Sequence, residues 1–374
     1  MVTDGQREVV LVTGFPRLVA RLVVRELLAG SKTRVVKLLV RGKFRADAEA
    51  FVRDEAHGAR IELIEGDAAA IDLGLSGAEF RQLADEVDYI QHHAQISYEG
   101  SDRRVAESLN VQGVREVLEL AKASRKLKRL VVQSTARVSG DRTGRVLEED
   151  LVAGQGFRSV IEETLYKAER LLRRAMDTVP VTVVRPAIVV GTSTTGDVDR
   201  FDGPYLLVML LLTSPVEISL PLPARGDALL HLVPVDYVAR ASVALMTEPG
   251  AVGRTFHLVD PAPLPARRVY ERIAQIAGRP MPRGFIPVNF TRALLRTPGL
   301  ERFVKSPRAF LEQLATPVQY ASNGAREILV PKGIECPAFE SYAEVMVQHV
   351  RDRIAARKAR RDTDEITDID DPLA

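Results

Sequence analysis

A strand-turn-helix segment near the N-terminus has the residue types that bind a phosphate. The apolar run 9–12 predicts a strand, and Thr13-Gly14-Phe15-Pro16-Arg17 follows it before a helical pattern starts at Leu18. A helix N-terminus presents free N–H groups and the positive end of its dipole, which favour an anion such as a pyrophosphate. The context therefore predicts a dinucleotide site, and its candidate residues are Gly14, Phe15, Pro16 and Arg17.

Basic residues follow the next predicted strand. That strand ends at Arg41, with Lys43 and Arg45 close behind. A basic residue at this point of a dinucleotide-binding fold can meet the 2′-phosphate of NADP. Arg41 is the candidate for that contact, and a solvated basic loop is the alternative.

Other chemistries find little support in the sequence. His92 and His93 are adjacent at the end of a predicted strand, where neighbouring side chains point to opposite faces, so the two cannot easily bind one metal. No spacing of Cys, His and Asp predicts a zinc site, and no G-x-S-x-G turn predicts a hydrolase. We therefore predict no metal site.

The elements that must position these residues alternate along the first half of the chain. Strands are predicted at 9–13, 34–40, 61–65, 88–91, 130–133 and 181–185, and helices at 18–28, 45–55, 80–86, 105–121 and 160–174. Such alternation predicts βαβ units and a parallel sheet covered on both faces. We expect an α/β fold: a doubly wound, Rossmann-like parallel sheet with a smaller, mostly helical C-terminal substrate-type domain.

Breaks in this pattern predict the domain boundaries. Residues 1–195 form the dinucleotide-binding domain, and 228–247 return to it. Residues 196–227 and 248–355 form the substrate-type domain, and 356–374 form a charged, disordered tail. The tail has a basic block and then an acidic block, so a docking peptide for a protein partner is the alternative there.

Composition places few other limits on function. The 374 residues include 52 basic and 50 acidic ones, so we expect no nucleic-acid partner. The single Cys336 fits a reducing compartment, and the first apolar run is too short for a signal peptide, so we predict a cytoplasmic protein. The run 205–212 is shorter than the roughly 20 residues of a transmembrane helix. It predicts a buried helix, with the wall of an apolar pocket or a lipid or protein contact as alternatives.

Several motifs resemble those of the extended short-chain dehydrogenase/reductase superfamily. The first turn corresponds to the superfamily's TGxxGxxG motif. Five further segments match in chain order: 90–95 (HxAA-type), 110–113 (NVxG), 132–138 (the active-site Ser/Thr segment), 184–191 (VRPxxVxG) and 233–238 (VPVDYV). Each is weak alone, and together they cover most of the chain.

Within the superfamily, the chain resembles the fatty-acyl and acyl-thioester reductases, with the terminal domains of carboxylic acid reductases nearby. Gly66-Asp67 followed by Leu73-Gly74-Leu75-Ser76, and Ser193-Thr194-Thr195-Gly196, are typical of that branch. The resemblance implies NADP as cofactor and an acyl or other apolar small molecule as ligand, which the run 205–212 would suit. It also implies that Asp67 contacts the adenine, that Ala94 and Gln95 lie in the cofactor site, and that Thr135 binds the substrate carbonyl.

The first turn departs from the superfamily pattern. Only Gly14 of the three glycines is kept, because Arg17 and Ala20 replace the other two. Alanine only crowds the packing of helix on strand, whereas Arg17 brings a Cβ and a long side chain into the space of the pyrophosphate. The cofactor is then bound weakly or not at all, unless Arg17 pairs with a phosphate as a charged donor.

The superfamily's proton-transfer pair is also missing. Its enzymes use a Tyr that protonates the carbonyl oxygen and a Lys four residues later, which share one helical face. Alignment on Ala168-Glu169 puts Ile161 and Leu165 at these positions. Tyr166 with Arg170 is an alternative pair, but its register is five residues away, which is roughly 140° around the helix.

These departures leave two main functional hypotheses and one minor one. The favoured one is a non-reducing pseudoenzyme that binds a ligand or a partner through the old site, as departures at chemically demanding positions within a kept fold suggest. The alternative is an active NADP-dependent oxidoreductase of acyl-thioester or aldehyde substrates with a non-standard proton donor. Non-redox catalysis on the same scaffold is a third possibility.

Overall fold

A parallel sheet of seven strands lies at the centre of the molecule. The computed structural model describes residues 7–98, 101–213, 222–223, 226–281, 284–286 and 317–363. The sheet order is β12-β7-β5-β4-β1-β2-β3, and each neighbouring pair is parallel. The strands are β1 (Glu8–Thr13), β2 (Arg34–Val40), β3 (Ile61–Glu65), β4 (Tyr89–His92), β5 (Arg129–Gln133), β7 (Val181–Pro186) and β12 (Arg254–Leu258). The order reverses between β1 and β4, which is where a doubly wound sheet holds its ligand.

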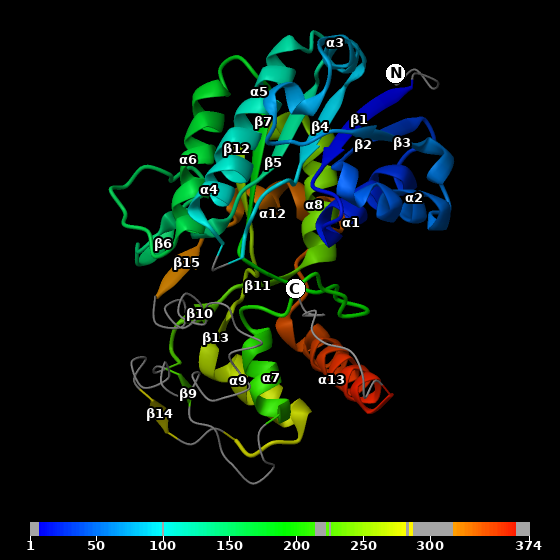
Figure 1. Cartoon of the computed structure of the whole chain (residues 1–374). Helices are drawn as coiled ribbons and strands as arrows, with labels where there is room; N and C mark the ends of the chain where they lie inside the picture. The colour runs from blue at the N-terminus through cyan, green and yellow to red at the C-terminus, as the bar shows by residue number, and fades with distance from the viewer. Residues whose placement is uncertain are drawn as a thin grey trace.

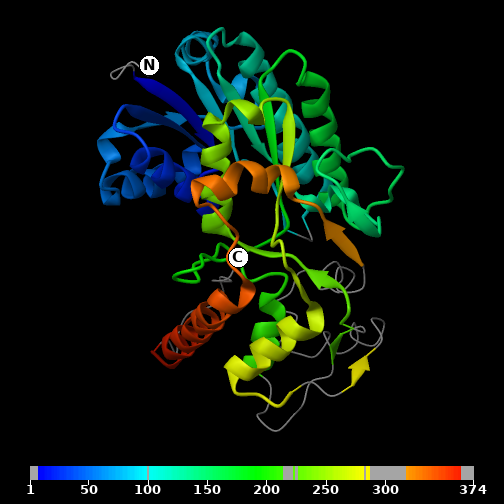
Figure 2. The same ribbon diagram turned by 180° about the vertical axis from the view of Figure 1, so that it is seen from behind.

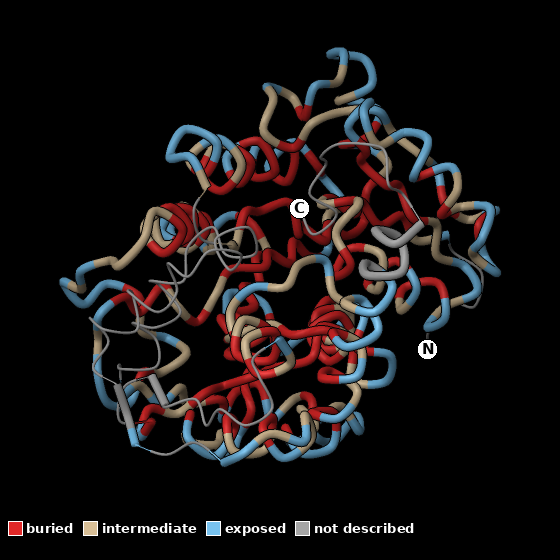
Figure 3. The backbone as a smooth tube through the Cα atoms, turned by 60° about the horizontal axis from the view of Figure 1, so that its bottom comes forward, coloured by how far each residue is buried: buried red, intermediate tan, exposed pale blue. Residues whose placement is uncertain are grey.

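Helices cover both faces of this sheet (Figure 1). On one face lie α1 (Leu18–Ala29), α2 (Arg45–Asp54), α8 (Val235–Thr247) and α12 (Asn323–Leu329); on the other lie α3 (Gly77–Glu86), α5 (Gly113–Ala123) and α6 (Val160–Ala175). Neighbouring side chains of a strand point to opposite faces, so Val10 and Val12 join the first apolar layer and Leu11 the second. Figure 3 shows the buried residues concentrated between these layers. The predicted α/β, doubly wound fold is confirmed.

A smaller group of elements follows at the carboxyl ends of the strands. It contains α7 (Tyr205–Thr213), α9 (Ala266–Ala277) and α13 (Phe339–Thr363), and the three helices pack together (Figure 2). Its short strands pair as β8 (Ile188–Val190) with β11 (Leu232–Pro234), β10 (Leu229–Leu230) with β13 (Leu264–Pro265), β9 (Leu222–Pro223) with β14 (Phe285–Ile286), and β6 (Gly144–Val146) with β15 (Val318–Tyr320).

The apolar run 205–212 lies in this second core. Within α7, Leu207, Val208, Met209 and Leu211 are buried against α9 and α13. The interpretation as a buried helix is therefore confirmed. None of the helices in the described part of the chain is long and apolar enough to cross a membrane.

Two segments differ from the predicted division of the chain. Strand β12 lies in the central sheet, whereas the sequence predicts that residues 248–355 belong to the second domain. The strand has only five residues, which is too short for its hydrophobic periodicity to identify it in the sequence. Helix α13 continues to Thr363, so the start of the predicted tail 356–374 is helical. Residues 364–374, with most of the acidic block, lie outside the described part.

The predicted helix 105–121 is divided into three parts. They are α4 (Arg103–Ala106), a π-helical segment (Glu107–Gln112) and α5. The π-helical segment carries Asn110, whose side chain accepts a hydrogen bond from Ile96 N (2.7 Å) and donates to Ile96 O (3.0 Å) and Thr164 Oγ1 (2.9 Å). Asn110 thereby ties the segment after β4 to α6, and these two elements border the site described next.

Candidate functional site

A cavity of about 400 Å³ opens at the carboxyl ends of β1, β2 and β4. Its polar walls include Arg17, Arg41 and Asp67, and its apolar walls include Phe44 and Ile96. All eight residues proposed from the sequence for the cofactor line it: Gly14, Phe15, Pro16, Arg17, Arg41, Asp67, Ala94 and Gln95. The structure thus brings these residues together, and their contacts with a cofactor stay a prediction.

Gly14 lets the first turn approach the end of β4 closely. Its φ is +105°, which favours glycine, and a Cβ here would lie 2.6 Å from the carbonyl carbon of His93. The three nearest atoms belong to the backbone of His93 and Ala94, so none of them can move aside easily. The turn and the segment after β4 consequently form one continuous wall of the cavity.

Replacing Gly14 by alanine is expected to destabilise the fold. The substitution combines a strained φ with a backbone clash, so we expect a loss of about 2 kcal/mol or more. Chemical denaturation measures the loss. Gly144→Ala is the matched control, since Gly144 has a φ of +75° but nothing within 4 Å of the added Cβ. Equal losses for both variants would contradict the close approach.

Arg17 does not extend into solvent. Its Nη1 donates to Gln95 O, and its Nη2 donates to Ser97 Oγ at 2.9 Å, so the guanidinium lies across the end of β4. Burial lowers the pKa of Arg17, and the Asp199 carboxylate opposes that shift. The N-terminus of α1 is occupied as well: Leu18 N donates to Asp199 Oδ1 (2.9 Å) and Oδ2 (3.0 Å).

Arg41 and Asp67 form an ion pair at the edge of the cavity. Arg41 Nε lies 3.1 Å from Asp67 Oδ2, and the two side chains are 45% and 32% exposed. Asp67 Oδ1 also accepts from Ala69 N at 3.0 Å, which fixes the carboxylate. A 2′-phosphate at Arg41 would therefore have to compete with Asp67, although the pair is accessible to water and weak for that reason.

Gln95 has hydrogen-bonding capacity that the described residues leave unused. The residue is 7% exposed, and neither its Nε2 nor its Oε1 has a partner within the described ranges. It lines both the large cavity and a space of about 10 Å³, which is the size of a single water site. A buried amide is costly without partners, so this side chain favours a hydrogen-bonding ligand or water beside it.

The helical face expected to carry the proton-transfer pair is apolar. Ile161 and Leu165 on α6 are 2% and 3% exposed, and they pack with Ile96, Val138 and Leu151. Leu165 also borders the small space beside Gln95. Neither side chain can donate a proton or hold a ribose hydroxyl.

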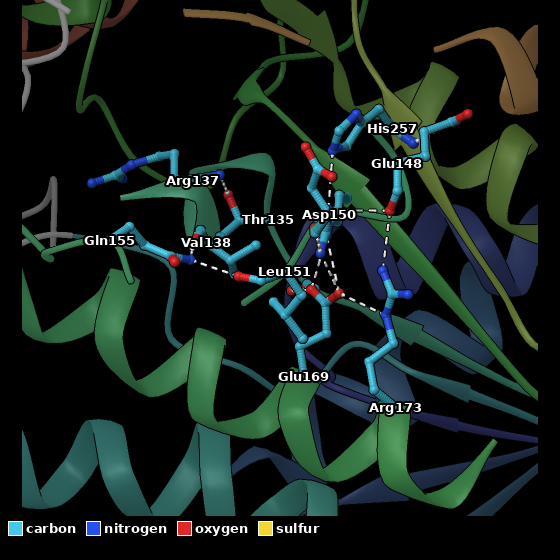
Figure 4. A network of polar contacts seen from close by, with 12 residues as sticks. Thr135, Arg137, Val138, Glu148, Asp150, Leu151, Gln155, Glu169, Arg173 and His257 are labelled. Carbon is cyan, nitrogen blue, oxygen red and sulfur yellow. Dashed lines mark hydrogen bonds and ion pairs between the residues drawn. The ribbon is translucent and has the colours of Figure 1, made fainter. Parts of the chain in front are cut away.

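Thr135 sits at the end of β5, near the same helix. Its Oγ1 accepts from Arg137 N (3.3 Å) and donates to Pro186 O (3.4 Å). Arg137 in turn pairs with the buried Glu162 at 3.2 Å. Figure 4 shows Thr135 and Arg137 to one side of the polar network of α6. The hydroxyl can bind a carbonyl, but no proton donor of the superfamily type stands beside it among the described residues of α6.

Tyr166, the alternative tyrosine, packs against the apolar cluster that contains Ile161 and Leu165. Its ring packs on Phe157 with centroids 4.8 Å apart, and the Arg170 guanidinium carbon lies 5.8 Å from the ring centroid. Like Ile161, Tyr166 lines neither the large cavity nor the small space beside Gln95. The i,i+4 pair of Tyr166 and Arg170 thus forms a cation–π contact next to the apolar cluster, and a catalytic role of Tyr166 stays a prediction.

Sequence reasoning missed the charged network that holds α6 against the sheet. Glu169 (0% exposed) and Arg185 (1% exposed) form a buried pair at 2.6 Å, and Ser134 Oγ donates to Glu169 at 2.8 Å. Arg185 also donates to the carbonyls of Glu148 and Asp150. Figure 4 shows Glu169 directed from α6 into this network, with Arg173 beside it. The signal in the sequence was a charged residue inside each of two motifs, Ala168-Glu169 and Val184-Arg185-Pro186.

With this geometry described, the chain can be compared with known proteins. Residues 12–242, more than half of the chain, match the model of a family of NAD-binding domains described as the male sterility protein. The chain belongs to this family. This places it in the reductase branch of the short-chain dehydrogenase/reductase superfamily, as its motifs predicted.

Individual proteins are also similar to this chain. A fatty acyl-CoA reductase of Drosophila melanogaster is 24% identical over 277 residues, covering 63% of this chain and 53% of the relative. One of the linear gramicidin synthase proteins of Brevibacillus parabrevis is 27% identical over 69% of this chain, which matches 5% of that protein. The chain therefore spans about half the length of the first of these relatives and a small fraction of the second. The terminal R domain of the myxalamid pathway is structurally similar, with a TM-score of 0.80, 25% identity and coverage of 94% and 92%.

Membership in this family supports a nicotinamide dinucleotide as ligand, and the residues present fit only one half of it. The adenosine side keeps a cavity, the close turn at Gly14 and the accessible Asp67. The diphosphate position does not fit, because the Asp199 carboxylate already accepts from the N–H of Leu18 at the N-terminus of α1. On the nicotinamide side, Ile161 and Leu165 supply no polar group.

Proposed function

We propose that this chain is a non-reducing member of the male sterility family that binds a small ligand in the cavity at the carboxyl ends of the strands. The observation that carries the proposal is the burial of Ile161 and Leu165 in an apolar cluster, at the two positions where hydride transfer to a carbonyl needs a proton donor and a cation. The fold-forming contacts around them, such as Glu169 with Arg185, are kept. A pseudoenzyme of this kind retains recognition without the proton transfer.

The lining of the cavity favours a ligand with an apolar body and a few polar groups. Phe44, Leu39 and Ile96 supply apolar surface, while Gln95 supplies an unused donor and acceptor. An acyl compound or a nucleoside meets these requirements. No residue of α7 lines the cavity, so the apolar run 205–212 gives an acyl chain no support there. NADP in particular, a protein partner for the charged C-terminal segment and the cytoplasmic location remain predictions.

Restoring the missing pair tests the proposal. The parent chain is expected to show no oxidation of NADPH or NADH above the enzyme-free rate with an acyl thioester or an aldehyde. Ile161→Tyr combined with Leu165→Lys places both groups on the helical face that packs against Ile96, which itself lines the cavity, so we expect turnover at least about 100-fold above the parent's background. The rate of cofactor oxidation at millimolar cofactor is the measurement.

The size-matched control is Ile161→Phe with Leu165→Met, which adds similar bulk without a proton donor and should stay inactive. Circular dichroism establishes that each variant is folded. Turnover by the parent chain would refute the non-reducing assignment and favour the alternative, an oxidoreductase with a non-standard proton donor. A folded Tyr/Lys variant that binds the nicotinamide cofactor in a titration but shows no activity would contradict the assignment of these two positions.

A further inference from the structure

Neither the residue before α1 nor the first turn of α1 supplies an anion or a capping side chain to the N-terminus of this helix. Arg17 stands at the position before the helix, and a guanidinium has no acceptor for the free N–H groups. The first turn of α1 contains no acidic residue either. Helix ends in this state favour a negatively charged group from elsewhere.

Asp199 supplies that group from 181 residues away in sequence. Both of its carboxylate oxygens accept from Leu18 N, at 2.9 and 3.0 Å. Arg21 Nη2 lies 3.9 Å from Asp199 Oδ1, and the charge of Asp199 acts favourably on Arg17. The Asp199 carboxylate, whose side chain is 35% exposed, is therefore bound to the N-terminus of α1 with one guanidinium within 4 Å and a second close enough to interact electrostatically.

We infer that Asp199 is an internal competitor for the diphosphate position and makes the cavity selective against ligands that carry phosphate. The inference rests on the cavity of the proposed function. A phosphate group and the Asp199 carboxylate need the same backbone N–H and the same positive surroundings, and like charges so close repel each other. Asp199 is thus a specificity-determining residue that sequence reasoning did not identify.

Side-chain contacts hold the segment with Asp199 in place. Asp236 on α8 accepts from Ser193 N (2.9 Å) and Ser193 Oγ (2.6 Å), which fixes the turn before it. After Asp199, the guanidinium carbon of Arg200 lies 4.1 Å from the ring centroid of Tyr98, and both residues line the cavity. Side-chain contacts therefore hold the chain before and after Asp199, and a phosphate ligand has to displace the carboxylate from Leu18 N.

The competition depends on the ligand's charge. A neutral nucleoside such as adenosine can use the apolar walls and the polar groups of the cavity without reaching the N-terminus of α1. ADP and NADP carry a diphosphate that must meet Asp199. The native chain should therefore bind ADP no more tightly than adenosine, in contrast to a site with a free helix end.

Titration calorimetry with adenosine, ADP, NADP and inorganic pyrophosphate tests this selectivity. Asp199→Ala removes the competitor, and Asp199→Asn removes its charge at nearly constant size. Both variants are expected to bind ADP and NADP about tenfold more tightly or better, and to gain pyrophosphate binding, with unchanged affinity for adenosine. Asp197→Asn is the matched control, because it removes a carboxylate from the same segment that contacts Thr195 instead of α1.

The inference is overturned if ADP affinity is unchanged in both Asp199 variants, which includes no binding by any variant. It is also overturned if the native chain already binds ADP at least tenfold more tightly than adenosine, or if Asp197→Asn has the same effect as the Asp199 substitutions. These outcomes are separate from the proposed function. Hydride transfer by the native chain would refute the non-reducing assignment whatever the affinities are, whereas unchanged ADP binding would refute only the role of Asp199.

Discussion

Lowering the pH from about 7 to about 5 is expected to destabilise the folded chain by several kcal/mol, because four imidazole rings are buried in their neutral form. Burial lowers the pKa of His92 and His257 to about 3 and that of His93 and His231 to about 4. Electrostatic repulsion from His93 further lowers the pKa of His92, and repulsion from Arg185 further lowers the pKa of His257. Each ring therefore resists protonation in the folded state.

The direction of this effect follows from proton uptake. In the unfolded chain a histidine has a pKa of about 6.5 and gains a proton below that pH. The folded rings do so only near pH 4 or pH 3, so their contribution is fully present above about pH 6.5 and is lost as the pH falls. Each histidine contributes about 1.4 kcal/mol per pH unit in this window, and four together approach the net stability of a typical domain.

Denaturant unfolding at pH values between about 7.5 and 5 measures the effect. His231→Phe should reduce the pH dependence by about a quarter, because it removes one of the four buried rings while keeping an aromatic ring beside Tyr320. The exposed His57 gives the matched control, His57→Phe, which should leave the dependence unchanged. A stability that is constant from pH 7.5 to 5.5 would contradict the buried neutral histidines.

Arg185→Leu is expected to cost about 3–5 kcal/mol of unfolding free energy, since it leaves the Glu169 carboxylate buried without its main partner. Arg173, whose Nε is 3.5 Å from Glu169 Oε1, compensates only in part. The backbone carbonyls of Glu148 and Asp150 lose their donor as well. The loss should loosen α6 from β7 and with it the helical face that borders the small space beside Gln95.

Chemical denaturation of the native chain and the variant gives the difference directly. The matched control is Arg45→Leu, which breaks an exposed i,i+4 pair with Glu49 (46% and 49% exposed) and should leave stability nearly unchanged. If Arg185→Leu is no more destabilising than this control, the buried pair is not what holds α6 in place.

Much of the fold and one wall of the site could be predicted from local patterns. Short β-branched runs alternating with helical periods identify six of the seven strands, because a buried parallel strand and an amphipathic helix each leave a regular signal. In any doubly wound sheet, the turn around Gly14 and the carboxyl ends of β2 and β4 lie at the same end of the strands. This is why all eight residues proposed from the sequence for the cofactor line one cavity.

The remaining features depend on contacts that are distant in sequence. Asp199 reaches Leu18 across 181 residues, and no local pattern distinguishes it from other loop carboxylates. The sequence allowed Arg17 either to fill the phosphate position or to bind a phosphate, whereas its guanidinium contacts Gln95 and Ser97 instead. Strand β12 has only five residues, so its place at the sheet edge follows from pairing with β7.

The central claim is that this reductase-like site transfers no hydride, and isotope transfer tests it most directly. The native chain is incubated to equilibrium with NADPH that carries deuterium at the transferable position and with an acyl thioester or an aldehyde. Mass spectrometry then measures deuterium in the substrate-derived alcohol or aldehyde. We expect no more deuterium than in the enzyme-free reaction, because Ile161 and Leu165 supply neither a proton donor nor a cation. Deuterium transfer that increases with the concentration of the native chain would contradict the account.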